Sequence, residues 1–104
     1  MQIVETSMNF DLDMLEKLLR SLSDRCPRFD DGALTKTMAL VKGMKHDETQ
    51  RHSVEVEFDG DVFYLGFEFF MDDIDAPDVR FWGTPAFVAW LESEYEAICD
   101  ELGI

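Results

Sequence analysis

Carboxylates are the side chains in this sequence whose number and grouping could support chemistry. The chain has 23 Asp and Glu residues against 9 Lys and Arg, which gives a net charge of −14. Residues 52–104 hold 14 acids and one base, Arg80, whereas residues 1–51 hold 9 acids and 8 bases. Paired carboxylates can transfer protons or bind divalent cations, although no spacing singles out one pair. Such an excess also repels phosphates, so direct binding to nucleic acid or to an anionic membrane is disfavoured.

Four aspartates cluster within seven residues, Asp72, Asp73, Asp75 and Asp78, and such a cluster is a candidate site for a divalent cation. A loop of the EF-hand kind needs alternating oxygen ligands, a glycine at its sixth position and a closing glutamate. Pro77 stands where the third alternating ligand is expected, and no suitably placed glycine follows. We therefore expect a solvated acidic loop without a bound metal.

Residues for nucleophilic catalysis are equally sparse, because a Ser or Cys nucleophile needs a positioned base. The only histidines, His46 and His52, flank one polar loop and have no context that suggests a triad. Cys26 and Cys99 are too few for a disulfide framework, lack zinc-ligand spacing and indicate free thiols in a cytoplasmic protein. The sequence predicts no catalytic residue and no cofactor. An enzyme or a metal-dependent regulator is therefore the least favoured function.

The most informative acidic group is a stripe on the predicted C-terminal helix. Glu92, Glu96 and Asp100 recur at i, i+4 and i+8 with no Lys or Arg beside them. Like charges at this spacing cost roughly 0.2–0.5 kcal/mol per pair, and Asp100 and Glu101 also lie at the negative end of the helix dipole. The charges on this helix therefore destabilise it locally. Such an arrangement indicates either a partner-binding role or selection for solubility.

Aromatic residues accompany these acids. Tyr64 and Phe70 fall on the more acidic face of a predicted strand, and Phe81 and Trp82 follow the acidic loop. Aromatic anchors among carboxylates suit a basic protein partner, because rings supply affinity and charge accelerates encounter. The alternative is that these rings fill a small core.

The elements that must position these residues begin with an amphipathic helix over residues 11–25, preceded by a short strand within residues 1–7. Asn9 or Asp11 can cap the helix, and Pro27 ends it. Five leucines recur at helical spacing and form one apolar face: Leu12, Leu15, Leu18, Leu19 and Leu22.

Residues 33–42 fit two structures. Leu34 and Met38 suit both a helix and a strand, while Val41 adds to the helical face and Leu40 to the strand face. Two threonines in the segment and a hairpin after it favour the strand. We interpret the Asp-Asp-Gly sequence before this segment as a turn, and the polar residues after it as a loop.

A β-hairpin is predicted around Asp59-Gly60, because both central residues of a type I′ turn need positive φ angles. A slip of one residue would move glutamates to the apolar face, so the pattern fixes the register. One face then carries Val54, Val56, Phe58, Phe63, Leu65, Phe67 and Phe69. The opposite face carries Glu55, Glu57, Val62, Tyr64, Gly66, Glu68 and Phe70.

Residues 79–82 are predicted as a further short strand, and a last helix follows. Thr84 is its N-cap, Pro85 its first residue and Gly103 its C-terminal cap. The order is an N-terminal helix, an antiparallel sheet of three to four strands and a C-terminal helix. We therefore expect an α+β fold with the helices packed on one sheet face, in a single compact domain over residues 1–104.

The function expected from these features is that of a small acidic module that binds and inhibits a basic protein, as an immunity protein, an antitoxin or a nucleic-acid mimic does. The main alternative is a small chaperone or adaptor, as a monomer or a homodimer, that holds a segment of another protein. The residues expected to bind the partner lie in three groups. They are Glu55, Glu57, Tyr64, Glu68 and Phe70 on the sheet, Asp72, Asp73 and Asp75 in the loop, and Glu92, Glu96 and Asp100 on the helix.

Overall fold

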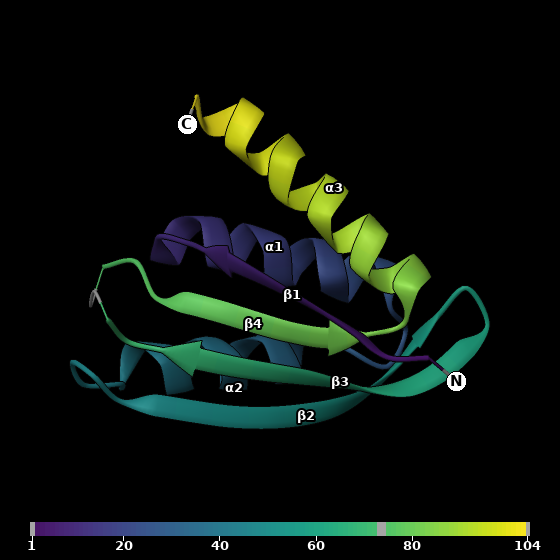
Figure 1. Ribbon diagram of the computed structural model, residues 1–104, viewed down its shortest axis with the longest axis horizontal. Helices are drawn as coiled ribbons and strands as arrows, with labels where there is room; N and C mark the ends of the chain where they lie inside the picture. Colours follow the sequence, from purple (N-terminus) through teal and green to yellow (C-terminus); the bar gives the residue numbers. More distant parts are fainter. Residues whose placement is uncertain (1, 73–74, 104) are drawn as a thin grey trace.

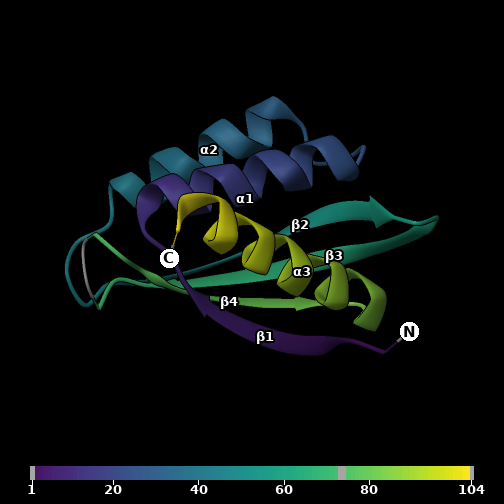
Figure 2. The same cartoon turned by 90° about the horizontal axis from the view of Figure 1, so that it is seen from above.

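One antiparallel sheet with helices on a single face makes up the computed structural model, which describes residues 2–72 and 75–103 (Figures 1 and 2). The sheet order is β1-β4-β3-β2. The predicted α+β fold is confirmed. In chain order the elements are β1 (Val4–Asn9), α1 (Leu12–Arg25), α2 (Asp31–Lys42), β2 (Thr49–Phe58), β3 (Asp61–Phe70), β4 (Asp78–Gly83) and α3 (Pro85–Leu102).

The first helix, α1, forms where the leucine periodicity predicts it. Asp11 is its N-cap, and the Met14 backbone N–H donates to Asp11 Oδ1 over 2.8 Å. The chain leaves the helix at Cys26, directly before Pro27, which cannot donate the next backbone hydrogen bond. The buried face consists of Met14, Leu15, Leu18, Leu19 and Leu22.

The strand predicted for residues 33–42 is wrong, because this segment lies in α2. Asp30, which we assigned to a turn, is the N-cap of α2, and its Oδ1 accepts from the Ala33 N–H over 2.8 Å. Leu34, Met38 and Val41 are then buried as one helical face. The satisfied N-terminus selects the helical period over the strand period, which the same residues fit almost equally well. The polar loop after α2 is also shorter than expected, since β2 begins at Thr49.

The hairpin of β2 and β3 has the predicted register. Val56 pairs with Phe63, and Val54 pairs with Leu65. The loop residues Asp59 and Gly60 have φ angles of 50° and 87°, as a type I′ turn requires. The alternation therefore places Val54, Val56, Phe58, Phe63, Leu65, Phe67 and Phe69 on the face that the helices cover.

The remaining elements complete the sheet and its cover. The short N-terminal strand is confirmed as β1, which pairs antiparallel with β4. At α3 the Phe87 N–H donates to Thr84 Oγ1 over 3.3 Å, and the helix ends at Gly103 with φ 72°. Phe87 packs edge-on against Phe58 and Phe63, with ring centroids 5.5 Å apart in each pair.

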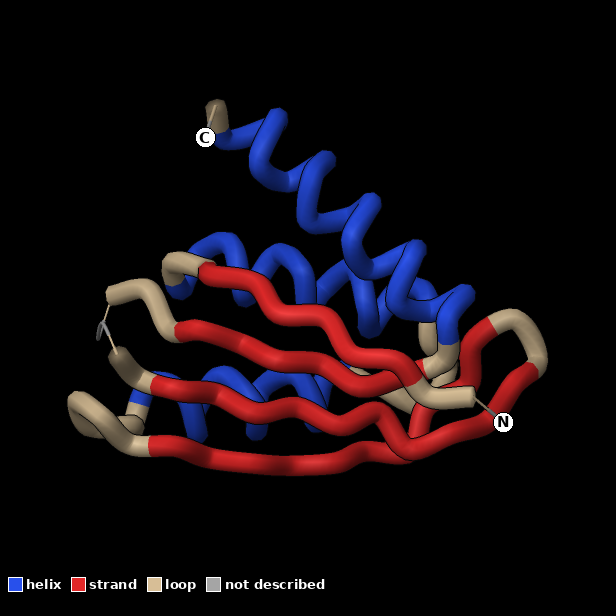
Figure 3. The backbone as a smooth tube through the Cα atoms, in the orientation of Figure 1, coloured by secondary structure: helices blue, strands red, loops and turns tan. Residues whose placement is uncertain are grey.

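The core lies between the helices and one sheet face, and the helices leave the other face uncovered (Figure 3). The C-terminal half of α3 runs away from the strands (Figure 1). Its side chains tie it to neighbouring elements: Tyr95 Oη donates to the Asn9 carbonyl over 3.0 Å, and Lys17 pairs with Glu101 at 3.1 Å. Within residues 2–72 and 75–103, none of the helices has the length and apolar character that a membrane crossing requires.

Candidate functional site

The candidate site is the uncovered face of the sheet, where alternate residues of all four strands point away from the helices. Three large apolar side chains are exposed on this face: Tyr64 by 69%, Val62 by 40% and Phe70 by 37%. The cross-strand register aligns polar and charged side chains around them. From β1 to β2, successive rows are Glu5, Trp82, Gly66 and Ser53; Ser7, Arg80, Glu68 and Arg51; and Asn9, Asp78, Phe70 and Thr49.

Trp82 lies at the centre of this face and is held from several sides. Its Nε1–H donates to Glu5 Oε2 over 3.0 Å. The guanidinium carbons of Arg51 and Arg80 lie 4.6 and 5.8 Å from the centroid of the ring. Gly66 provides room beside it, since a Cβ there would lie 3.2 Å from Trp82 Cε3. The indole is thus fixed by cation–π contacts, one hydrogen bond and a glycine.

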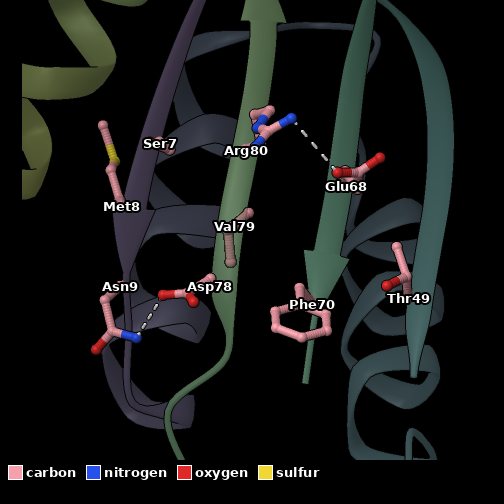
Figure 4. A pocket seen from close by; sticks show the side chains of 9 residues that line it. All are labelled: Ser7, Met8, Asn9, Thr49, Glu68, Phe70, Asp78, Val79 and Arg80. Atoms are coloured by element: carbon pink, nitrogen blue, oxygen red, sulfur yellow. Dashed lines mark hydrogen bonds and ion pairs between the residues drawn. The ribbon is translucent and has the colours of Figure 1, made fainter. Parts of the chain in front are cut away.

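Arg80 connects two of the acids on this face. Its Nε lies 3.3 Å from Glu5 Oε1, and its Nη1 lies 3.7 Å from Glu68 Oε1 (Figure 4). Glu68, which the sequence placed among the partner-binding acids, therefore already faces a cation of its own chain. Arg51 stands directly opposite Glu68 on β2 and adds positive charge to the same row.

A shallow polar hollow of about 510 Å³ lies at one end of the uncovered face (Figure 4). Asn9 closes one side, where its Nδ2 donates to Asp78 Oδ1 over 2.9 Å and to the Ala76 carbonyl over 3.0 Å. Phe70 and Thr49 lie on the other side. Among the described residues, no three His, Cys, Asp or Glu side chains come together as ligands for a metal. Most of the side chains that line the hollow are polar or charged.

Arginines from the near-neutral first half neutralise some acids of the second half. Arg28 pairs with Glu55, and Arg25 Nη2 lies 2.7 Å from Asp59 Oδ1. The Arg25 guanidinium also covers the Phe58 ring, 4.7 Å from its centroid. Around the hairpin, bases from the first half of the sequence thus neutralise some of the acids from the second half.

The acidic stripe of α3 remains unneutralised. Glu92, Glu96 and Asp100 are exposed, and none has an ion pair with any other residue in the part of the chain that the structure describes. Their helix packs against α1, β1 and β4 on the covered side of the sheet. The stripe therefore does not share the uncovered face with Glu55 and Glu68.

The structure thus divides the predicted partner-binding residues. Glu55, Glu57, Tyr64, Glu68 and Phe70 share the uncovered face, as the hairpin register predicts. Asp72 and Asp75 are exposed beyond the end of β3, and Asp73 lies outside the described residues.

Sequence reasoning missed Glu5, Arg51 and Trp82 as parts of this face. Glu5 and Trp82 are distant in the sequence and meet only because β1 pairs with β4. The alternation of Asp78, Arg80 and Trp82 is a signal that could have placed these three residues on one face. No comparable signal indicates which strand lies next to them.

The two cysteines offer no exposed nucleophile on the uncovered face. Both are free thiols, and Cys26 is fully buried in the core while Cys99 is half-buried on α3. Burial raises the pKa of the Cys26 thiol to about 11, so it stays protonated at neutral pH.

No protein-family model, curated protein or solved structure matches this chain. The geometry and charge of the uncovered face and of α3 are therefore the features that indicate a function.

Proposed function

We propose that this protein is a small acidic protein-binding module that binds a basic partner protein and inhibits it, as an immunity protein or an antitoxin does. The observation that carries the proposal is the exposure of Tyr64 by 69% on the uncovered sheet face, with Val62 and Phe70 also exposed and glutamates beside them. An exposed tyrosine costs little conformational entropy to fix and offers both an apolar ring and a hydroxyl, which suits a binding anchor.

In this proposal, the sheet face and α3 contribute to binding in different ways, because their charges differ. On the sheet face, Glu55 and Glu68 already face arginines, so this surface recognises its partner mainly through Tyr64, Phe70 and the polar hollow. On α3, the unpaired stripe creates a negative field that accelerates the approach of a basic protein. This division favours an inhibitor of the immunity or antitoxin type over a nucleic-acid mimic, which needs its carboxylates in one continuous row.

The test is to identify the partner and then to measure association with it. The tagged protein captures partners from a lysate of its native host, and the captured protein is purified for stopped-flow kinetics. We expect a partner rich in Lys and Arg, with an association rate that falls roughly tenfold or more from low to high salt. The Tyr64→Ala variant should bind about tenfold or more weakly with an unchanged melting temperature.

Leu102→Ala is the matched control, because Leu102 is exposed by 39% but lies on α3 away from the sheet face. Its dissociation constant should equal that of the unmodified protein. An association rate that does not change with salt, or a Tyr64→Ala variant that binds as tightly as the control, would contradict the proposal.

A chaperone or adaptor is the second candidate, and one observation favours it. An apolar groove of about 250 Å³ lies between α2 and β2 and is lined in part by Leu40, Val54 and Phe67. It runs beside a sheet edge to which an extended segment could add as a further strand. A salt-tolerant complex that Tyr64→Ala leaves intact would favour this function over the first.

A further inference from the structure

The free edge of β2, which borders the uncovered face, carries unpaired backbone groups that can form a second interface. We propose that two copies of this chain pair antiparallel along β2, around a two-fold axis at Ser53, and so join their sheets into one. The inference does not depend on Tyr64 or on α3, because it rests on the backbone and the charges of a strand edge.

The β2 edge is long and is protected by neither a proline nor a bulge. β2 spans Thr49–Phe58 without proline or lysine, and its pairing with β3 runs without a bulge from end to end. Natural proteins usually shorten, twist or cover such an edge. In Figures 1 and 3, β2 forms the outer border of the sheet with no described element beyond it, whereas α3 packs against the opposite edge strand, β1.

The hairpin turn determines which backbone groups of β2 are free. In a two-residue type I′ loop, the flanking residues Phe58 and Asp61 exchange backbone hydrogen bonds. The bonding then alternates along the strand, so Val56 and Val54 also bond to β3. The residues between them direct their N–H and C=O groups to the open edge. These outward residues are Thr49, Arg51, Ser53, Glu55 and Glu57, and their side chains all lie on the uncovered face.

The outward residues carry charges of both signs; within one copy Arg51 lies over the Trp82 ring and Glu55 pairs with Arg28. An antiparallel pair with its axis at Ser53 sets Arg51 of each copy opposite Glu55 of the other. Directly opposite residues have Cβ atoms roughly 4.5–5.5 Å apart, which a long arginine side chain spans easily. With the axis at Ser53, every outward N–H and C=O group of β2 has a hydrogen-bonding partner on the other copy. An axis at Val54 would set Arg51 opposite Glu57 instead and would leave Thr49 unpaired.

The net charge of −14 opposes association of two copies, but the acidic stripe lies far from this edge. The acidic stripe belongs to α3, which packs near β1 and β4, whereas β2 is at the opposite border. Three strand spacings separate β1 from β2, about 14 Å, which exceeds the screening length of about 8 Å at physiological ionic strength. Arg28 and Lys36 add positive charge on the β2 side, at Glu55 and in the groove.

Exchange of the two charges tests this interface. By analytical ultracentrifugation, we expect the unmodified protein to sediment with twice its chain mass of 12.0 kDa at micromolar concentration. Arg51→Glu alone and Glu55→Arg alone should each weaken the dimer at least about tenfold, because two attractive pairs become repulsive. An equimolar mixture of the two variants should restore a dimer with one chain of each kind, since both cross-strand contacts then join opposite charges.

Glu57→Arg is the matched control from the same strand. If the axis is at Ser53, this variant should dimerise alone as the unmodified protein does, and it should not rescue the Arg51→Glu variant on mixing. Circular dichroism and thermal melting check that each variant is folded, and recovery in the mixture is independent of small stability losses. An unmodified protein that stays monomeric throughout the micromolar range would overturn the proposal, as would charge-exchange variants that fail to recover on mixing. Rescue by Glu57→Arg would overturn the axis at Ser53.

Discussion

On its covered face the sheet presents Val56 and Phe69 to the helices, whereas on its uncovered face the adjacent positions carry Glu55 and Phe70. Both faces arise from the same strands, because successive side chains point to opposite sides. The covered side chains are close to fully buried. The uncovered ones form ion pairs, cation–π contacts and a polar hollow, and several remain accessible to solvent.

The difference shows which residues the fold needs and which it does not. Full burial of a large apolar side chain contributes roughly 1.5–3 kcal/mol, whereas exposed ion pairs of the kind seen on the uncovered face contribute about 0–1 kcal/mol. Stability therefore explains the covered face but leaves the exposure of Tyr64 and Val62 unexplained. Their exposure is the observation on which the proposed binding function rests.

The largest expected effect comes from two adjacent phenylalanines. Phe69 is fully buried and Phe70 is exposed by 37%. Phe69→Ala should lower the free energy of unfolding by about 3–5 kcal/mol through lost burial and a cavity, and Phe70→Ala by less than about 1 kcal/mol. Urea denaturation measures both. Equal losses would mean that the two faces contribute alike to stability.

Alkaline pH tests the covered side through Cys26. Burial raises its pKa from 9.0 to about 11, so the folded state keeps the proton that the unfolded chain releases first. The stabilising effect is complete below pH 9.0 and is lost as the pH rises to about 11, by roughly 3 kcal/mol in total. Unfolding free energies measured across this range should show the loss, and a Cys26→Ala variant should lack it. Identical pH profiles for the two proteins would contradict the burial of this thiol.

On the uncovered face, Gly66→Ala should destabilise by about 1 kcal/mol, because the new methyl group presses on a ring that cannot easily move. Its Cβ would lie 3.2 Å from Trp82 Cε3, and Trp82 is held by Glu5 and Arg51. Tryptophan fluorescence and urea denaturation detect the displacement and its cost. In a Trp82→Leu background the same substitution should cost nothing, and an equal loss there would show that the crowding is elsewhere.

The smallest effect concerns α3 and has the opposite sign. Glu96→Lys replaces two repulsive i, i+4 pairs, with Glu92 and Asp100, by attractive ones. It should raise the free energy of unfolding by about 0.5–1 kcal/mol at low salt, and the gain should shrink at high salt. Asp72→Lys, which changes the charge of an exposed loop residue by the same amount and in the same direction, serves as a control for net charge. A Glu96→Lys variant without any gain would show that the stripe carries no local strain.

Much of the fold follows from local signals that agree with one another. The alternation from Val54 to Phe58 and the Asp59-Gly60 turn determine the hairpin register, and Thr84 with Pro85 marks the start of α3. The prediction for the α2 segment was wrong because its apolar residues fit two periods. Asp30 as an N-cap was the signal that could have decided between them.

The candidate site was predictable only in part, for a physical reason. Tyr64, Glu68 and Phe70 follow from the hairpin pattern alone, whereas the pairing of Arg28 with Glu55 depends on where the connection between α1 and α2 meets the hairpin. No local property of the sequence encodes that distance. The charge count of the second half therefore overstated how acidic the sheet face is.

The pairing of β1 with β4 has a consequence for the order of folding. Asn9 pairs with Asp78, and most of the chain lies between them, while β2, β3 and β4 follow one another in sequence and in space. Closing a long loop costs more entropy than forming adjacent pairs, so contacts of high sequence separation tend to form late. We expect the three-stranded meander to assemble first and the first strand of the chain to dock last. During synthesis, β1 therefore remains unpaired until β4 has left the ribosome.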